Sequence, residues 1–363
     1  MEQKIIKAFS ISCLLSALLG CLLLFWLAPN HKNVITAREQ RQLLAQQEKE
    51  KLSKMSGLEL MKYYTAKKEK LDEEQAGIFT QQLRLQLPRG VDLEDLSIDN
   101  DYVGQCLTVS IPTKDEDYFY NYPMIGKSGH IVDLNLESDG KTAMLQIMLD
   151  GVYELDAEQD NQYLYLDFIS PSDLYDKIVV IDAGHGGSDP GAVRTGVNEK
   201  DIDLAILLQL KELFDKQKDV KVYYTRTTDE NPALHDRVRL ANQAGADLFL
   251  SIHNNAVITD ASTVNGTKAM YNETEEENEQ YGSREFAQIC LEEVCDGTGS
   301  TNLGLEAGSR ILIIRESEMP MALIEVGFMS NAAELGRLNS EEYQKQTAES
   351  LYRAVMRAYE QGF

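Results

Sequence analysis

The carboxy-terminal half of the chain alternates short apolar runs with helical patterns, and this alternation constrains the fold more than any other feature of the sequence. Candidate strands lie at 178–184, 220–225, 247–253, 267–271, 310–314 and 322–328. Candidate helices lie near 201–216, 233–244, 279–295 and 341–361. Near-continuous apolar strands separated by helices predict an α/β fold, with a mostly parallel open sheet and helices on both of its faces. In such sheets the ligand-binding groups lie at the carboxyl ends of the strands.

Two of the five histidines fall at those predicted ends, and a glutamate lies at the start of a predicted helix. His185 follows the first strand in the glycine-rich turn GHGGSDPG, His253 closes the strand at 247–253, and Glu199 lies where a loop enters a helix. Two histidines and a glutamate are the ligand set of a catalytic zinc site, whose fourth position is open to water. A phosphate-binding turn is the alternative, but the dinucleotide and P-loop patterns are both absent. Purely structural histidines are a second alternative.

Glu325 lies inside the otherwise apolar segment PMALIEVGF. A carboxylate there is unfavourable unless it is paired or lies at the open end of the sheet. Zinc-dependent hydrolysis needs such a group, because a carboxylate takes a proton from the attacking water and passes it to the leaving amine. A glutamate paired with a core arginine or with backbone amides explains the position equally well.

Four segments carry a family resemblance: VVIDAGHGGSDPGA, NEKDIDLA, the run from TRTTDENPALHD to SIHNNA, and MPMALIEVGFMSN. In this order they resemble the motifs of the type 3 (AmiC/CwlV-like) zinc-dependent N-acetylmuramoyl-L-alanine amidases, over about residues 177–362. The resemblance implies hydrolysis of the amide that joins N-acetylmuramic acid to L-alanine in the stem peptide of peptidoglycan.

The same resemblance implies a role for each matched position. Three residues are implied to bind Zn²⁺: His185, Glu199 and His253. Glu325 is implied to be the catalytic acid/base, and Asn255 is implied to border the substrate groove. Two other functions stay open, namely another zinc peptidase acting on wall peptides and a catalytically silent scaffold that binds the wall.

A strongly acidic segment, NETEEENEQYGSRE, separates Tyr271 from Phe286. In related amidases a helix inserted in this region can cover the zinc until a partner protein withdraws it. A regulatory protein is therefore one candidate partner. A solvated loop is the alternative, and the shortness of the segment favours it.

Residues 8–28 carry no charge across 21 positions, which is about the length that an α-helix needs to cross a hydrocarbon core roughly 30 Å thick. We expect a transmembrane helix that anchors the chain in the cell membrane by a single pass. Lys4 and Lys7 precede the run and favour an internal amino terminus, so that the catalytic domain faces the cell wall. A cleaved signal peptide is the alternative.

Four regions follow from these patterns. They are a signal anchor at 1–30, a helical charged stalk at 31–88, a small all-β domain at 89–172, and the zinc amidase domain at 173–363. The stalk includes an expected helix near 72–85. The β-rich region resembles wall-targeting domains found in front of some amidases. The spacing of Tyr118, Tyr120 and Tyr122 predicts that their rings share one face of a strand, where they either stack on sugars or belong to the core or a half-buried sheet surface.

The net charge is −24, from 35 Lys and Arg against 59 Asp and Glu. This excess argues against a nucleic-acid partner, because phosphate backbones are held by clustered basic side chains. An acidic hydrolase also gains little nonspecific adhesion to an anionic wall. We therefore expect the anchor and the β-rich domain to localise the enzyme.

Overall fold

A computed structural model describes residues 37–72, 82–127, 129–160, 162–258, 263–273 and 282–363. The chain divides into two units, residues 1–55 and 56–363. In the first unit the structure describes helix α2 (Ala37–Leu52), which is rich in good helix formers, as expected for the stalk. The predicted transmembrane helix at 8–28 lies outside the described residues. None of the helices that the structure does describe is long and apolar enough to span a bilayer.

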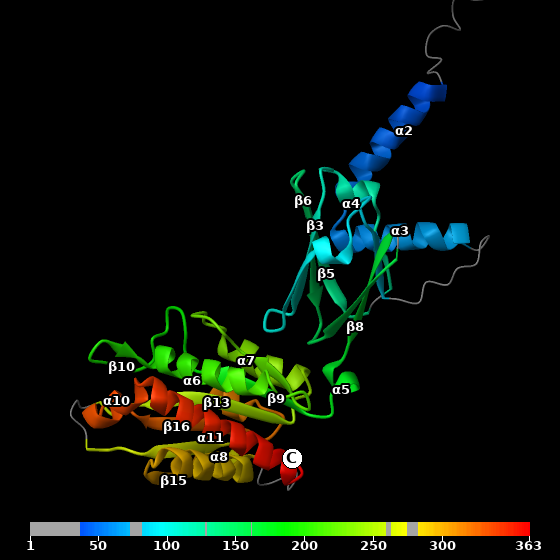
Figure 1. Cartoon of the computed structure of the whole chain (residues 1–363). Helices are drawn as coiled ribbons and strands as arrows, with labels where there is room; N and C mark the ends of the chain where they lie inside the picture. The colour runs from blue at the N-terminus through cyan, green and yellow to red at the C-terminus, as the bar shows by residue number, and fades with distance from the viewer. Residues whose placement is uncertain (1–36, 73–81, 128, 161, 259–262, 274–281) are drawn as a thin grey trace, which may run out of the picture. The chain divides into compact units, whose positions relative to one another are not determined.

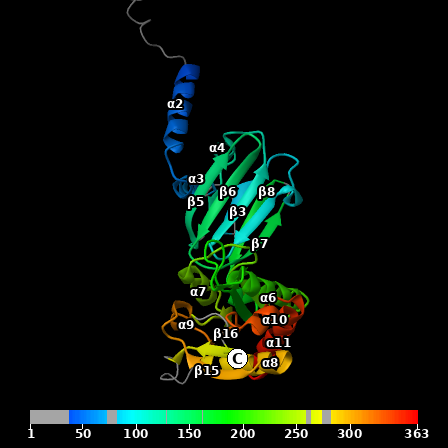
Figure 2. The ribbon, with the colours of Figure 1, turned by 90° about the vertical axis from the view of Figure 1, so that its left-hand side faces the viewer.

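The second unit begins with helix α3 (Gly57–Asp72) and a β-rich region of two four-stranded antiparallel sheets. One sheet has the order β4-β1-β8-β7 and the other β2-β3-β6-β5, and strands of both are visible in Figure 2. The strands are β1 (Leu83–Gln86), β2 (Ser97–Asp101), β3 (Cys106–Pro112), β4 (Ile125–Gly126), β5 (Ile131–Ser138), β6 (Thr142–Leu149), β7 (Glu154–Gln159) and β8 (Tyr163–Ile169), with a short 3₁₀ turn at Leu93–Asp95. Both sheets contribute alternate side chains to one apolar core, which confirms the β-rich texture read from the sequence.

Two expectations for this region are wrong. The helix predicted at 72–85 is wrong at its carboxyl end, because Leu83–Gln86 form strand β1, which pairs with β4 and β8. Residues 73–81 of that prediction lie outside the described residues. Leu83 and Leu85 are fully buried at a spacing of two, which only a strand allows on one face. The β-rich region therefore starts before residue 89.

The tyrosine stripe is the second error. Tyr118 and Tyr120 lie in a short helix, α4 (Tyr118–Asn121), and Tyr122 caps it, so the three rings do not line one face of a strand. Residues two apart on a helix point in different directions. Tyr118 is wholly buried, and its hydroxyl donates to the carbonyl of Gln86, 2.5 Å away. It therefore belongs to the core and cannot stack on a sugar.

The carboxy-terminal sheet has six strands in the order β12-β9-β13-β16-β14-β15. Four of its five neighbouring pairs are parallel and the β14–β16 pair is antiparallel, which confirms a mostly parallel sheet. The strands are β9 (Ile178–Ala183), β12 (Lys221–Tyr224), β13 (Leu248–Asn255), β14 (Thr267–Tyr271), β15 (Asn302–Ala307) and β16 (Met321–Phe328). A small hairpin of β10 (Val193–Arg194) and β11 (Val197–Asn198) precedes helix α6.

The strand predicted at 310–314 is wrong. That segment enters helix α9 (Leu312–Arg315), and the edge strand is β15 instead. In α9 the consecutive residues Ile313 and Ile314 are both buried, whereas β15 has no fully buried residue. An edge strand buries little, so its sequence carries a weak apolar signal.

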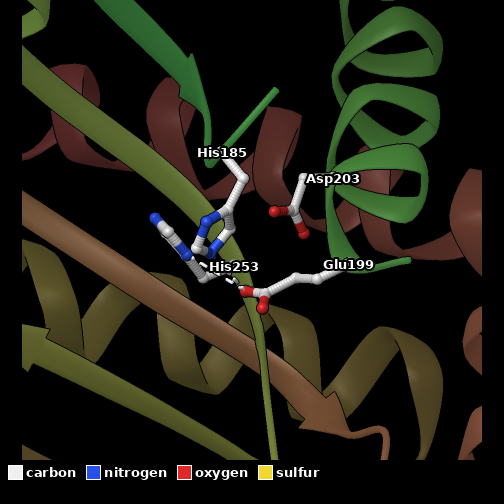
Figure 3. A group of neighbouring side chains, drawn as sticks. All are labelled: His185, Glu199, Asp203 and His253. Carbon is white, nitrogen blue, oxygen red and sulfur yellow. Dashed lines mark hydrogen bonds and ion pairs between the residues drawn. The ribbon is translucent and has the colours of Figure 1, made fainter. Parts of the chain in front are cut away.

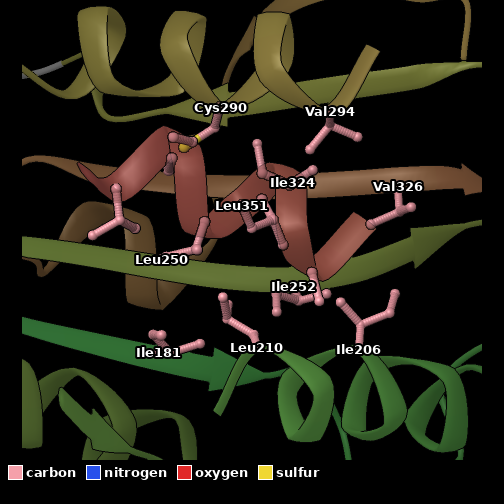
Figure 4. Packing of buried hydrophobic residues seen from close by; sticks show 14 of the residues in the cluster. Ile181, Ile206, Leu210, Leu250, Ile252, Cys290, Val294, Ile324, Val326 and Leu351 are labelled. Carbon is pink, nitrogen blue, oxygen red and sulfur yellow. The ribbon is translucent and has the colours of Figure 1, made fainter. Parts of the chain in front are cut away.

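Helices cover both faces of this sheet, as expected: α6 (Glu199–Phe214) and α11 (Glu341–Glu360) lie in front of it in Figure 1, and Figure 2 shows helices on either side of it. One face packs against α6, α8 (Ser283–Thr298) and α11. Figure 4 shows this layer, with Leu250 and Ile324 of the sheet facing Leu210 of α6 and Leu351 of α11. The opposite face packs against α7 (Leu234–Gln243) and α9. The remaining short helices are α5 (Pro171–Leu174) and α10 (Ala332–Leu338).

Leu250→Ala should destabilise the carboxy-terminal domain by about 2–5 kcal/mol, because it removes a fully buried side chain and leaves a cavity. The matched control is Leu208→Ala, since Leu208 is 39% exposed on α6 and should change stability by only about 0.5 kcal/mol. Denaturant unfolding of both variants measures the difference. Equal losses from the two substitutions would contradict the packing described above.

Candidate metal centre

The three predicted ligands meet at the carboxyl ends of two adjacent parallel strands. His185 follows β9, His253 lies near the end of β13, and Glu199 is the first residue of α6. Because β9 and β13 are parallel neighbours, their carboxyl ends lie together at the same edge of the sheet. Figure 3 shows the three side chains converging there. The structure thus brings together residues that are 14 to 68 positions apart in the sequence.

The distances fit a compact cluster. Glu199 Oε1 lies 3.2 Å from His185 Nε2 and 3.1 Å from His253 Nδ1. The two imidazole rings meet nearly edge to face, with centroids 4.8 Å apart. Glu199 is only 5% exposed, so its carboxylate is held inside the protein and does not sample solvent freely.

Glycines in the turn let these side chains approach. A Cβ atom at Gly184 would collide with the ring of His253, and one at Gly191 would lie 2.6 Å from Glu199 Oε2. His185 itself has φ of +58°, a left-handed conformation that is unfavourable for a residue with a Cβ atom. The glycine-rich turn therefore allows close packing around the two histidines and Glu199.

Neighbouring groups orient each ligand. His185 Nδ1 donates to Asp189 Oδ2 at 2.9 Å, which turns Nε2 toward Glu199. Glu199 accepts the N–H of Ala192 on Oε2 at 2.8 Å and the N–H of Asn254 on Oε1 at 3.0 Å. A carboxylate behind a ligating histidine is typical of zinc sites, because it fixes the tautomer and the ring orientation.

The electrostatics of the cluster follow from this pairing. Burial opposes protonation of His185, but its hydrogen bonds to Glu199 and Asp189 outweigh burial and raise its pKa to about 9. Burial would raise the pKa of Glu199, but its hydrogen bonds to the two histidines lower it well below the usual range. Two imidazoles facing a firmly ionised carboxylate form a donor set suited to Zn²⁺, so the residues fit that ion.

Asp203 is a member of this cluster that the sequence analysis missed. It lies one turn after Glu199 on α6, is fully buried, and accepts a hydrogen bond from Asn254 Nδ2 at 2.7 Å. Its Oδ2 has no hydrogen-bond partner among the described residues. Burial, and next the charge of Glu199, raise its pKa well above the usual range. Its hydrogen bond to Asn254 supports the segment that follows His253, and its ligand atom lies within 4.8 Å of those of the other three residues. The sequence did hold one sign of this: Asp203 is four residues after Glu199, a spacing that puts both side chains on the same face of a helix.

Glu325 lies on β16 at the same level as His253 on β13, because the two residues are register partners. Its Oε2 is buried and has no hydrogen-bond partner in the described part of the chain, so the alternative of a structurally paired carboxylate gains no support. Burial is the main cause that raises its pKa to about 7, and the nearby histidines oppose this. A carboxyl with a pKa near 7 can both take up and release a proton at neutral pH.

Asn255 ends β13, and its carbonyl accepts the N–H of Met329 at 2.8 Å. Met329 lines a groove of about 440 Å³ beyond the ends of β13 and β16. The groove is lined by Val193, Arg194, Thr195, Val197, Met329, Ser330, Ala332, Leu335, Gly336 and Asn339. Asn255 thus lies next to a groove residue without lining the groove itself, and its contact with substrate stays a prediction.

Comparison with known proteins identifies the family. The family model described as N-acetylmuramoyl-L-alanine amidase matches residues 179–357. The Bacillus subtilis protein YqiI, itself uncharacterised, is 35% identical over 185 residues, which is 51% of this chain and 86% of that protein. The germination-specific N-acetylmuramoyl-L-alanine amidase of Bacillus subtilis is 30% identical over 200 residues, covering 51% of this chain and 81% of the relative.

Among solved structures, the catalytic domain of CwlV, an N-acetylmuramoyl-L-alanine amidase from Bacillus (Paenibacillus) polymyxa var. colistinus, is 34% identical. The match covers 51% of this chain and 98% of that domain, with a TM-score of 0.47. All of these matches cover about half of the chain, and the family model places its match in the carboxy-terminal α/β domain. One relative is 35% identical over 86% of its own length, another is 30% identical over 81%, and the family model agrees with both. The chain therefore belongs to the N-acetylmuramoyl-L-alanine amidase family.

Proposed function

We propose that this chain is a zinc-dependent peptidoglycan hydrolase that cleaves the amide between N-acetylmuramic acid and L-alanine of the stem peptide. The observation that carries the proposal is the convergence of His185, Glu199 and His253 on one point, with Glu325 alongside, in a member of the amidase family. Family membership supports the bond that is cut, and the donor set supports the metal.

Three side chains would hold the ion: His185 through Nε2, His253 through Nδ1 and Glu199 through its carboxylate. A bound zinc ion supplies Lewis-acid polarisation of the scissile carbonyl and makes water a better nucleophile near neutral pH. Asp189 holds the proton on His185 Nδ1, so that Nε2 is the nitrogen free to bind metal. Asn254 donates its N–H to Glu199 and keeps that carboxylate in place.

Glu325 carries the proton in this mechanism. Its pKa of about 7 leaves a substantial ionised fraction that can accept a proton from the attacking water. The same group, once protonated, donates to the nitrogen of L-alanine as the amide bond breaks. Since an amine leaves readily only after it is protonated, this transfer completes the hydrolysis.

The location of the enzyme follows from its substrate and remains our prediction. Peptidoglycan lies outside the cytoplasmic membrane, so a catalytic domain facing the wall fits the expected anchor at 8–28. The acidic segment that suggested a regulatory partner falls largely within 274–281, outside the described residues. A regulatory protein therefore stays a prediction, as does wall targeting by the β-rich region.

Digestion of purified peptidoglycan by the full-length chain should release stem peptides that carry a free L-alanine amine and leave the glycan strands intact. The amide bond at the lactyl group is the only bond that gives both products together. Mass spectrometry of the soluble and insoluble fractions identifies them. Peptides cut within the stem would instead indicate a wall peptidase, and unchanged wall material would indicate a binding scaffold.

Glu325→Gln should lower the rate of hydrolysis about 10²–10⁴-fold while the zinc content stays at the wild-type level, because it removes proton transfer and leaves the proposed ligands in place. Turnover and metal content are measured on the same preparation. Glu342→Gln, on the exposed side of α11, is the matched control and should leave both unchanged. Wild-type turnover in Glu325→Gln would assign the acid/base role to another group.

Zinc should bind more tightly as the pH rises from about 6 to 8. His185, with a pKa of about 9 in the metal-free protein, holds a proton that zinc must displace, so each unit of pH should tighten binding about tenfold for one displaced proton. Competition with a chelator at several pH values measures the slope. Asp189→Asn removes one of the carboxylates that raise this pKa and should flatten the slope. A pH-independent affinity in the wild type would rule out a histidine ligand of this kind.

A further inference from the structure

Two buried arginines lie behind the turn that carries His185. Arg226 follows β12 and is 3% exposed, and Arg237 lies in α7 and is 2% exposed. Burying a guanidinium is unfavourable unless its donors are satisfied and its charge is balanced. The donors of both residues go mainly to backbone carbonyls around the proposed metal ligands.

Arg237 uses all five of its N–H donors. Nη1 donates to Asp182 Oδ1 and to the carbonyl of Ala183, both at 2.7 Å. Nη2 donates to the carbonyl of His185 at 2.6 Å and to Asn231 Oδ1 at 3.4 Å. Nε donates to the carbonyl of Pro232 at 3.0 Å. The guanidinium therefore holds directly the backbone of a proposed metal ligand.

Arg226 completes the arrangement. Its Nε donates to the carbonyl of Ala183 at 2.9 Å, and its Nη2 donates to the carbonyls of Gly184 at 2.7 Å and Lys200 at 3.0 Å. Three consecutive carbonyls, at 183, 184 and 185, thus accept from the two arginines. Lys200 directly follows Glu199, so Arg226 also ties the His185 turn to the first turn of α6.

Asp182 balances one of the two positive charges. It is wholly buried, and its carboxylate accepts from Arg237, from Thr225 Oγ1 and from Ser251 Oγ, the last two at 2.6 Å. Burial alone would raise its pKa, but Arg237 and the two hydroxyls hold the pKa below the usual range. The group therefore stays ionised as the counter-charge of Arg237.

We propose that Arg226 and Arg237 are positioning residues, which hold the backbone of His185 and, through the carbonyl of Lys200, the first turn of α6 in the geometry that binds the metal. This inference rests on the proposed function, since it concerns the ligands of the proposed zinc ion. The left-handed backbone of His185 is unfavourable by itself, and the arginine bonds on both sides of it keep the turn from relaxing. A planar fork can hold several carbonyls at once, whereas the single ammonium group of lysine cannot reach them all.

The test compares Arg226→Lys and Arg237→Lys with the wild type in the full-length chain. Each variant keeps the positive charge but loses the planar guanidinium group and its array of N–H donors. We expect zinc affinity, measured by chelator competition, to fall about tenfold or more, as it does when groups that orient metal ligands are removed. The visible spectrum of the cobalt-substituted protein should change as well, because it reports ligand geometry directly.

Asp247→Ala is the matched control for a loss of stability alone. Asp247 accepts the N–H of Ile178 at 2.7 Å at the opposite end of the sheet from the proposed metal site. The Asp247→Ala substitution should lower the unfolding temperature without changing zinc affinity or the cobalt spectrum. The proposal is overturned if the arginine variants behave like Asp247→Ala, with lower unfolding temperatures and wild-type zinc affinity.

A double variant, Asp182→Asn with Arg237→Met, guards against misfolding, because removing a buried ion pair as a unit is often tolerated. It should fold and still bind zinc about tenfold or more weakly, since the carbonyl of His185 loses its donor. Wild-type affinity in this variant would contradict the proposal while leaving the proposed function intact. A wild-type chain that binds no zinc would overturn both.

Discussion

The parallel pairing of β9, β13 and β16 is the constraint on which the rest of the site depends. Its register sets Ala183 beside Ile252 and His253 beside Glu325. Functional side chains from three distant parts of the sequence therefore lie together at one edge of the sheet. Apolar layers on both faces of the sheet fix this register, because a slip of one residue would force the close-packed side chains of both layers to repack. The precision of the metal centre is therefore a consequence of core packing.

The central strands and the two histidine ligands could be predicted from the sequence because the strands are buried. Buried parallel strands are continuous apolar runs, so a polar residue such as His253 near the end of one strand or Glu325 inside another is conspicuous. Glu199 was recognised by its place at the entry to a helix. The structure confirms that these residues meet, and their roles in binding metal and moving protons remain proposals.

Three other features of the structure could not be predicted from the sequence. β15 is an exposed edge strand and has no apolar run, whereas the segment 310–314 contains the apolar pair Ile313 and Ile314. The strand was therefore predicted in the wrong segment. Tyr118 fits the alternation of a strand, yet its hydroxyl is satisfied inside the core from a helical turn. The roles of Arg226 and Arg237 depend on carbonyls that the chain presents only after folding. A residue's spacing in sequence cannot show which backbone atoms its side chain will reach.

The proposed mechanism requires that His185, Glu199 and His253 hold one zinc ion at the carboxyl edge of the sheet. The most direct measurement is anomalous diffraction at the zinc absorption edge from crystals of the zinc-loaded chain. We predict one peak, about 2.0–2.2 Å from His185 Nε2, His253 Nδ1 and an oxygen of Glu199. A peak elsewhere in the molecule, or no peak between these three side chains, would contradict this metal site.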